Sequence, residues 1–171
     1  MNIKTVFEAT ECSDKVPELI ISFKRPKVAR RPLETTEAQV QFLREIFDPN
    51  TFELQEELIL LNMDDDFSPV CYYRLGKGLP DKVEISYQLI LSILIVTQAT
   101  NFITAHNHPN GVSLPSYSDV DSAHNMRIRC SHFGITCVDE IIISSLEEPE
   151  GDDPGYYSLA DNGLFFESAF G

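Results

Sequence analysis

The sequence predicts an α/β domain with a mixed β-sheet flanked by helices. Two observations carry this prediction. Helical and strand patterns alternate through the middle of the chain, and several predicted strands are nearly continuous apolar runs, which is typical of strands buried on both faces. A length of 171 residues and a hydrophobic fraction of 43% suffice for one domain with a core of two or three layers.

The first 50 residues are expected to form an N-terminal extension that packs on the core or leads into it. Residues 18–23 have the pattern of a short strand, and a basic stretch follows. Thr36 to Gln39 has the pattern of a capping box, and the next apolar residues recur at helical spacing, which predicts a helix that ends before residue 48. The main domain is then expected to span residues 51–171.

The remaining elements follow from the hydrophobic pattern and the turn residues. Helices are predicted over residues 83–98, where apolar residues are too numerous for a half-exposed strand, and from Ser116 to Phe133, just before the stop signal Gly134. Strands are predicted at residues 58–63, 70–75, 101–106, 135–138, 141–144 and 156–160.

The charge distribution limits the classes of partner. A net charge of −14 opposes tight binding to nucleic acid, which depends on the neutralisation of phosphates. The stretch Lys24–Arg31 is the exception, because it holds five basic residues and no acidic one. It is a candidate contact for phosphate, for an acidic partner, or for the acidic body of its own chain. The last reading is the one we favour.

Nothing in the sequence indicates a membrane or an exported protein. No run reaches the ~18 consecutive apolar residues of a membrane span, and the N-terminus lacks the pattern of a signal peptide. The four cysteines, at positions 12, 71, 130 and 137, form no Cys-x-x-Cys pair. We therefore expect free thiols and a cytoplasmic location.

A metal site is predicted where the strand at 101–106 ends. Because side chains alternate along a strand, His106 and His108 project to one side while Asn107 points away, with the two Cα atoms roughly 6.5–7 Å apart. A loop rich in Pro and Gly can bring Asp119, in the first turn of the next helix, over the strand end. Two imidazoles and one carboxylate form a ligand set that suits zinc, with the fourth position left to water.

Each of these residues also has a plainer interpretation. A lone His-x-His in a loop is more often structural than metal-binding, and Asp119 is placed to complete a capping box with Ser116. The full pattern of His-x-His, seven residues and Ser-x-x-Asp is far rarer than its parts. A zinc nucleobase deaminase is disfavoured, because its His-x-Glu and Cys-x-x-Cys motifs are absent.

This pattern resembles the JAMM motif of JAB/MPN+ metalloproteases. The longer string HNHPNGVSLPSYSD resembles the RadC branch of that family, and the likeness extends over roughly residues 36–165. The resemblance implies a three-layer MPN/JAB (cytidine-deaminase-like) fold and a zinc ion held by His106, His108 and Asp119. It also implies hydrolysis of a peptide or isopeptide bond in a peptide or protein substrate.

The resemblance further implies an upstream carboxylate that acts as general acid and base. The match falls on Glu56, with Glu57 as the alternative one residue away, and Ser116 is implied as the hydrogen-bond donor to the oxyanion. RadC-like proteins have also carried a DNA-repair label. The competing expectation is therefore an accessory or binding module in DNA repair or mobile-element metabolism, with a structural or vestigial metal site.

Three positions depart from the usual family string. Asn110 replaces a serine after Pro109, Glu140 stands where a histidine is usual, and Gln88 lies near a usual basic residue. None of the three is a predicted ligand. For Glu140 and Gln88 the expected consequence is altered substrate recognition.

Overall fold

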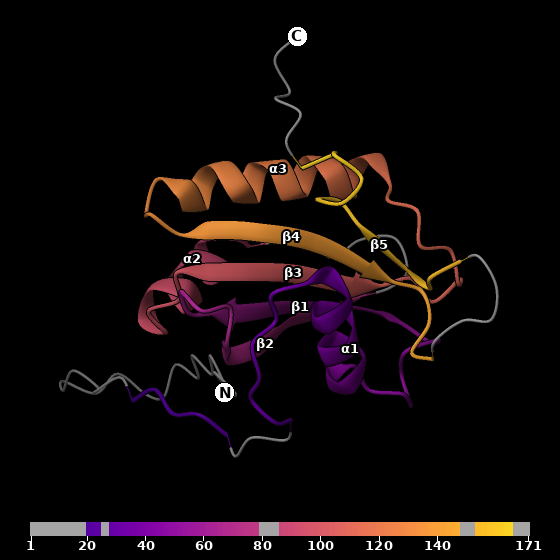
Figure 1. Cartoon of the computed structure of the whole chain (residues 1–171), viewed down its shortest axis with the longest axis horizontal. Coiled ribbons are helices and arrows are strands. Elements are labelled where there is room, and N and C mark those ends of the chain that lie inside the picture. Colours follow the sequence, from indigo (N-terminus) through magenta and orange to yellow (C-terminus); the bar gives the residue numbers. More distant parts are fainter. Residues whose placement is uncertain (1–19, 25–27, 79–85, 148–152, 166–171) are drawn as a thin grey trace, which may run out of the picture.

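A five-stranded mixed sheet forms the middle layer of the computed structural model, which describes residues 20–24, 28–78, 86–147 and 153–165 (Figure 1). The strand order is β2-β1-β3-β4-β5. Strands β3 and β4 run parallel, and the other neighbours are antiparallel. The strands are β1 (Glu56–Met63), β2 (Pro69–Gly78), β3 (Asn101–Asn107), β4 (Thr136–Ile143) and β5 (Tyr156–Ser158).

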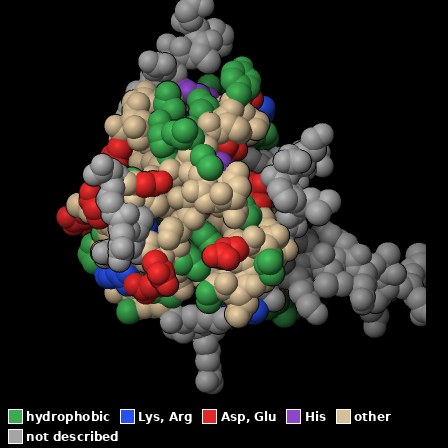
Figure 2. All heavy atoms as spheres, turned by 90° about the vertical axis from the view of Figure 1, so that its right-hand side faces the viewer, with side chains coloured by type: hydrophobic (Ala, Val, Ile, Leu, Met, Phe, Trp, Pro, Cys, Tyr) green, Lys and Arg blue, Asp and Glu red, His purple; other side chains and the backbone are tan. Residues whose placement is uncertain are grey.

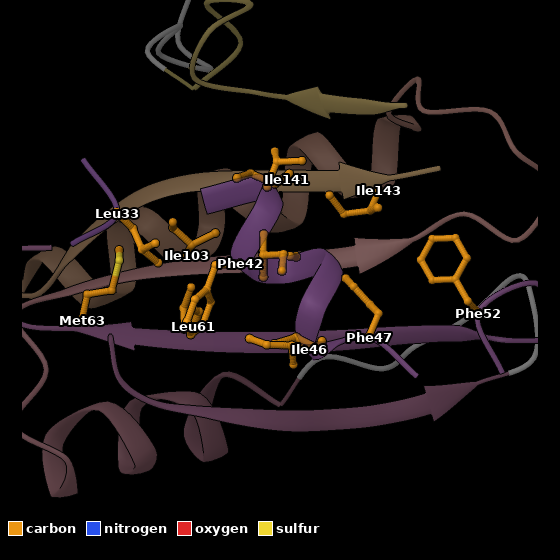
Figure 3. Close-up of a cluster of buried hydrophobic side chains, with 14 residues drawn as sticks. Leu33, Phe42, Ile46, Phe47, Phe52, Leu61, Met63, Ile103, Ile141 and Ile143 are labelled. Carbon is orange, nitrogen blue, oxygen red and sulfur yellow. The ribbon is translucent and has the colours of Figure 1, made fainter. Parts of the chain in front are cut away.

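Helix α1 (Thr36–Ile46) covers one face of the sheet. Figure 3 shows its apolar side chains packed on those of β1, β3 and β4, and the cluster continues to Phe52 beyond the helix. The N-cap is Thr35, one residue before the predicted Thr36, and its hydroxyl accepts a hydrogen bond from the Ala38 amide. The capping box predicted for Thr36 and Gln39 was therefore wrong. Gln39 is buried instead and donates to the Leu33 carbonyl at 3.0 Å.

Helices α2 (Tyr87–Val96) and α3 (Tyr117–Ser131) cover the opposite face. Their apolar side chains join those of alternate strand residues, such as Leu60, Phe102 and Ile142, in a second buried cluster. Both sheet faces are therefore covered, which explains the continuous apolar runs of β1 and β4. The predicted three-layer α/β architecture is confirmed.

Several boundaries differ from the prediction. The segments 135–138 and 141–144 form one strand, β4, because the two acidic residues between them are buried and continue the ladder with β3. Residues 20–23 of the strand predicted at 18–23 are irregular, and its first two residues lie outside the described part. Residues 83–85 of the second predicted helix also lie outside it, and β5 ends at residue 158.

The topology brings distant segments together at one edge of the sheet. The parallel strands β3 and β4 end there, and antiparallel β1 begins there, with Leu58 opposite His106. Helix α3 also begins near this edge, after the loop formed by residues 108–116. Among the described residues no helix is long and apolar enough to cross a membrane.

Candidate metal centre

Four side chains predicted from the sequence meet at this edge of the sheet. His106 lies near the end of β3 and is 4% exposed, and His108 follows the strand. Asp119 lies in the first turn of α3, and Glu56 is the first residue of β1. Strand pairing and the turn into α3 thus gather residues that are up to 63 positions apart in the chain.

The donor atoms of these side chains lie close together. The Nε2 atoms of His106 and His108 are 3.1 Å apart. The Asp119 carboxylate oxygens lie 3.7 Å from Nε2 of His106 and 3.9 Å from Nε2 of His108. Glu56 Oε1 is 4.0 Å from Nε2 of His106, and Glu56 forms a compact group with the two histidines.

The other ring nitrogen of each histidine fixes its tautomer. His108 Nδ1 lies 2.6 Å from the Val112 carbonyl, which only accepts, so this nitrogen carries the proton. His106 Nδ1 lies 2.9 Å from a Glu140 carboxylate oxygen and donates in the same way. Both Nε2 atoms therefore direct lone pairs at each other. At 3.1 Å such lone pairs repel unless a cation, either a proton or a metal ion, lies between them.

This donor set fits zinc. A tetrahedral zinc ion with bonds of about 2.0–2.1 Å holds nitrogen ligands about 3.3–3.4 Å apart. The distances of 3.1, 3.7 and 3.9 Å among His106, His108 and Asp119 bracket that spacing. Each imidazole also has the hydrogen-bonded second nitrogen that is usual for metal-ligating histidines.

Glu56 and Glu57 point to opposite faces of β1. Glu56 faces His106, and its side chain is 16% exposed. The Glu57 side chain is 3% exposed and forms an ion pair with Arg74 of the neighbouring strand β2. Glu57 is therefore engaged in the structure of the sheet, and Glu56 is the carboxylate that reaches the histidines.

Asn107, between the two histidines, ties the start of β1 to the end of β3. Its side chain is fully buried; Nδ2 donates to the carbonyls of Phe52 and Gln55 at 2.6 and 3.0 Å, and Oδ1 accepts from the Glu57 amide at 2.7 Å. These contacts hold the backbone on both sides of Glu56. The alternation of side chains along a strand predicts that Asn107 points away from the histidines, but it does not predict this contact.

Asp119 serves two purposes at once. Its Oδ2 accepts a hydrogen bond from the Ser116 amide at 2.7 Å, and the Ser116 hydroxyl accepts from the Asp119 amide at 3.3 Å, which completes a capping box. The cap fixes the Asp119 rotamer with its carboxylate toward the histidines. The plainer interpretation of Asp119 and the metal-site interpretation are therefore compatible.

Ser116 lies at the exposed mouth of this arrangement, and its hydroxyl is 2.8 Å from that of Ser118. The structure thus places the serine beside Asp119 at the start of α3. No described contact joins it directly to either histidine.

Glu140 contacts His106 from the buried side, a contact that the sequence did not predict. It was expected to alter substrate recognition, but its side chain is 8% exposed and lies behind His106, away from the surface. One carboxylate oxygen meets His106 Nδ1, and the other accepts a hydrogen bond from Thr104. A charged residue inside an apolar strand was the available signal. This signal is lost when residues 135–144 are read as two strands with a turn at Asp139 and Glu140.

The surroundings shift the pKa values of both histidines. Burial lowers the pKa of His106, but the hydrogen bond to Glu140 and the nearby charges of Glu140, Asp119 and Glu56 outweigh it, and the net pKa is raised. Burial and the neighbouring His106 lower the pKa of His108. His106 is thus the member of the pair that holds a proton more readily.

Exposed apolar side chains flank the candidate site. They belong to the turn before β1, to the loop between β3 and α3, and to the first residue of α3: Leu54 is 75% exposed, Val112 50%, Leu114 65% and Tyr117 88%. Figure 2 shows histidine surface next to hydrophobic and acidic side chains on one face of the molecule. A patch of this kind beside a polar centre is typical of a binding surface.

The described part of the basic stretch contacts the chain itself. Arg30 forms an ion pair with Asp64, and Arg31 with Glu45 at 2.6 Å. Residues 25–27 lie outside the described part, so the outside partner proposed for Lys24–Arg31 stays a prediction. The three described cysteines, Cys71, Cys130 and Cys137, are free thiols, and Cys12 is not among the described residues.

The fold and the arrangement at its edge define an α/β domain of the JAB/MPN class. A family model for the RadC-like JAB domain matches residues 33–164. The chain therefore belongs to the RadC-like JAB domain family, as its histidine motif predicted.

Curated relatives are bacterial proteins named UPF0758. One from Porphyromonas gingivalis is 29% identical over 110 residues, which is 64% of this chain and 45% of the relative. One from Streptococcus equi subsp. zooepidemicus is 28% identical over 112 residues, covering 66% and 46%. One from Streptococcus uberis is 34% identical over 77 residues, covering 45% and 30%. The chain thus spans less than half the length of these relatives.

Proposed function

We propose that this protein is a zinc-dependent hydrolase of peptide or isopeptide bonds. The observation that carries the proposal is the approach of the two Nε2 atoms to 3.1 Å beside two carboxylates. His106, His108 and Asp119 would hold the ion, because the Asp119 carboxylate oxygens lie 3.7 and 3.9 Å from the two Nε2 atoms. Glu56 lies close to both histidines as well, with Oε1 4.0 Å from Nε2 of His106, and is assigned to the proton transfers instead. A bound zinc ion acidifies a water molecule to a pKa of ~7 and polarises a carbonyl group.

Glu56 is assigned the proton transfers. Its carboxylate lies next to His106 and is partly open to solvent, so it can accept a proton from the attacking water. The same carboxyl group then delivers that proton to the leaving amine. The Asn107 contacts on both sides hold Glu56 in place for these two steps.

Ser116 is assigned the stabilisation of the oxyanion. Its hydroxyl is exposed at the N-terminus of α3, where the helix dipole also favours negative charge. In the cap this oxygen accepts from the Asp119 amide, and when the Ser118 hydroxyl is the donor in their contact, the Ser116 proton is available for donation. A hydroxyl so placed can donate to the oxygen that gains charge when water adds to the carbonyl.

A peptide or protein is the substrate class that fits the surroundings best. The exposed side chains of Leu54, Val112, Leu114 and Tyr117 belong to the segments that carry the site residues and would offer apolar contact for the residues next to the scissile bond. The net charge of −14 disfavours a nucleic-acid substrate. We expect the protein to act in the cytoplasm without membrane association.

The test is cleavage of a degenerate peptide library and of isopeptide-linked peptides by the zinc-loaded chain, with new termini detected by mass spectrometry. Glu56→Gln should abolish cleavage while zinc is retained. Glu53→Gln changes an exposed carboxylate in the preceding turn and should cleave as the wild type does. Equal activity of the wild type and Glu56→Gln would refute the proposed role of Glu56.

The alternative is an accessory or binding module in DNA metabolism. Its candidate contact is the basic stretch Lys24–Arg31 of the sequence, in which Arg30 and Arg31 already pair with carboxylates of the same chain. Reversal of these charges would reduce retention on DNA if the alternative holds. Unchanged retention would exclude direct contact through this stretch.

A further inference from the structure

We infer that Glu140 is a positioning residue for His106: its buried carboxylate fixes the imidazole with the Nε2 lone pair toward the metal centre. The inference rests on the proposed function in that it names a determinant of the same site. It concerns a side chain that lies outside the ligand set and does not meet the surface.

The geometry of the contact is that of a carboxylate–histidine pair. Glu140 Oε1 lies 2.9 Å from His106 Nδ1, and both side chains are almost fully buried, with exposures of 8% and 4%. Burial of this kind shields the contact from solvent. The contact therefore decides which ring nitrogen carries the proton and how the ring is turned.

Thr104 holds the Glu140 carboxylate in this place. Its hydroxyl donates to Oε2, so each carboxylate oxygen has a partner. Thr104 lies opposite Glu140 in the parallel ladder of β3 and β4, and two positions before His106 on the same strand face. The three side chains thus form a row on one face of the sheet, and the backbone of two central strands sets their spacing.

Removal of Glu140 would change the proton arrangement at the centre. Without an acceptor at Nδ1, the neutral His106 ring would place its proton on Nε2, where His108 Nε2 accepts at 3.1 Å. The Nε2 proton of that tautomer occupies the position that a metal ion would take. Glu140 therefore keeps the pair of lone pairs available for a cation.

The neighbouring Asp139 offers a matched control. It is a buried carboxylate on the same strand, but its oxygens accept hydrogen bonds from the Ser158 hydroxyl and from the amides of Ala160 and Glu140. No described contact joins Asp139 to either histidine. A change at this position tests for general effects of altering β4.

The experiment combines two measurements on the full chain. Long-range ¹H–¹⁵N NMR of the metal-free protein at about pH 9, above the ordinary histidine pKa, reports the tautomer of His106. Competition with a chromophoric chelator gives the zinc Kd. Glu140→Met has a side chain of similar length but no oxygen that accepts the Nδ1 hydrogen bond. Glu140→Gln keeps a neutral oxygen that can accept it, and Asp139→Asn is the control. Circular dichroism checks that each is folded.

We expect the wild type and Glu140→Gln to show the Nδ1–H tautomer, and Glu140→Met to shift toward Nε2–H. Zinc affinity should fall about 10-fold in Glu140→Gln and about 100-fold in Glu140→Met, and stay unchanged in Asp139→Asn. If Glu140→Met does not fold, Glu140→Gln alone carries the affinity test.

Two results overturn the inference: an unchanged tautomer and Kd in a folded Glu140→Met, or an equal loss of affinity in Asp139→Asn. A wild type that binds no zinc while its His106 tautomer depends on Glu140 would refute the proposed function and leave the positioning role intact.

Discussion

Asn107 should stabilise the fold and the site together, and Asn107→Leu tests both effects. Leucine has a similar volume but makes none of the three hydrogen bonds that the buried amide forms with Phe52, Gln55 and Glu57. At about 1 kcal/mol for each bond, the free energy of unfolding should fall by about 3 kcal/mol. The matched control is Asn101→Leu, at the other end of β3, where the side chain is only partly buried.

Urea denaturation of both variants without metal gives the comparison, because bound metal would add its own stabilisation. The control should lose about 1 kcal/mol or less. In the zinc-loaded protein, Asn107→Leu should also lower kcat about 100-fold, the usual cost of an ångström of misplacement of a catalytic group. A stability of Asn107→Leu within about 0.5 kcal/mol of the wild type would refute the reasoning that the amide holds the start of β1.

Three further predictions follow from the same contacts. Glu56→Gln should keep zinc and lower kcat about 100-fold or more, whereas Glu57→Gln should chiefly lower stability in urea because it weakens the pair with Arg74. Ser116→Ala should lower the free energy of unfolding in urea by about 1 kcal/mol, because the α3 cap is lost. It should also reduce kcat more than it changes KM, and an unchanged kcat would exclude Ser116 from the mechanism. Burial raises the pKa of Asp139 to about 6 from 3.8, so ionisation of this carboxyl group destabilises the folded state. The loss of folding free energy is absent below about pH 4, where the group is protonated in both states, and complete above about pH 6. Asp139→Asn should therefore gain stability relative to the wild type by up to about 3 kcal/mol between pH 4 and pH 7, and a difference that does not vary with pH would contradict this assignment.

The sequence predicted those parts of the fold that depend on local pattern. The apolar runs of β1 and β3 and the capping box of Ser116 and Asp119 are visible in consecutive residues, and the structure reproduces them. The histidine pair was predictable because the period of a strand places His106 and His108 on one side. The structure adds the distance of 3.1 Å between their Nε2 atoms.

Contacts between strands were not predictable from one sequence. Glu140 reaches His106 only because β4 lies parallel to β3 in a particular register, and Asn107 reaches Gln55 only because β1 is antiparallel to β3. Asp139 and Glu140 also caused β4 to be predicted as two strands. Two adjacent acidic residues in a sequence indicate a turn when their buried partners are not known. Glu57 shows the same limit, since its partner Arg74 lies on a different strand.

The most direct test of the account is the metal content of the chain, purified without a histidine tag and measured by inductively coupled plasma mass spectrometry. We predict about one zinc ion per wild-type chain, lost in folded His106→Ala, His108→Ala and Asp119→Ala variants. A folded wild type that contains no metal even after zinc is supplied would contradict the central claim.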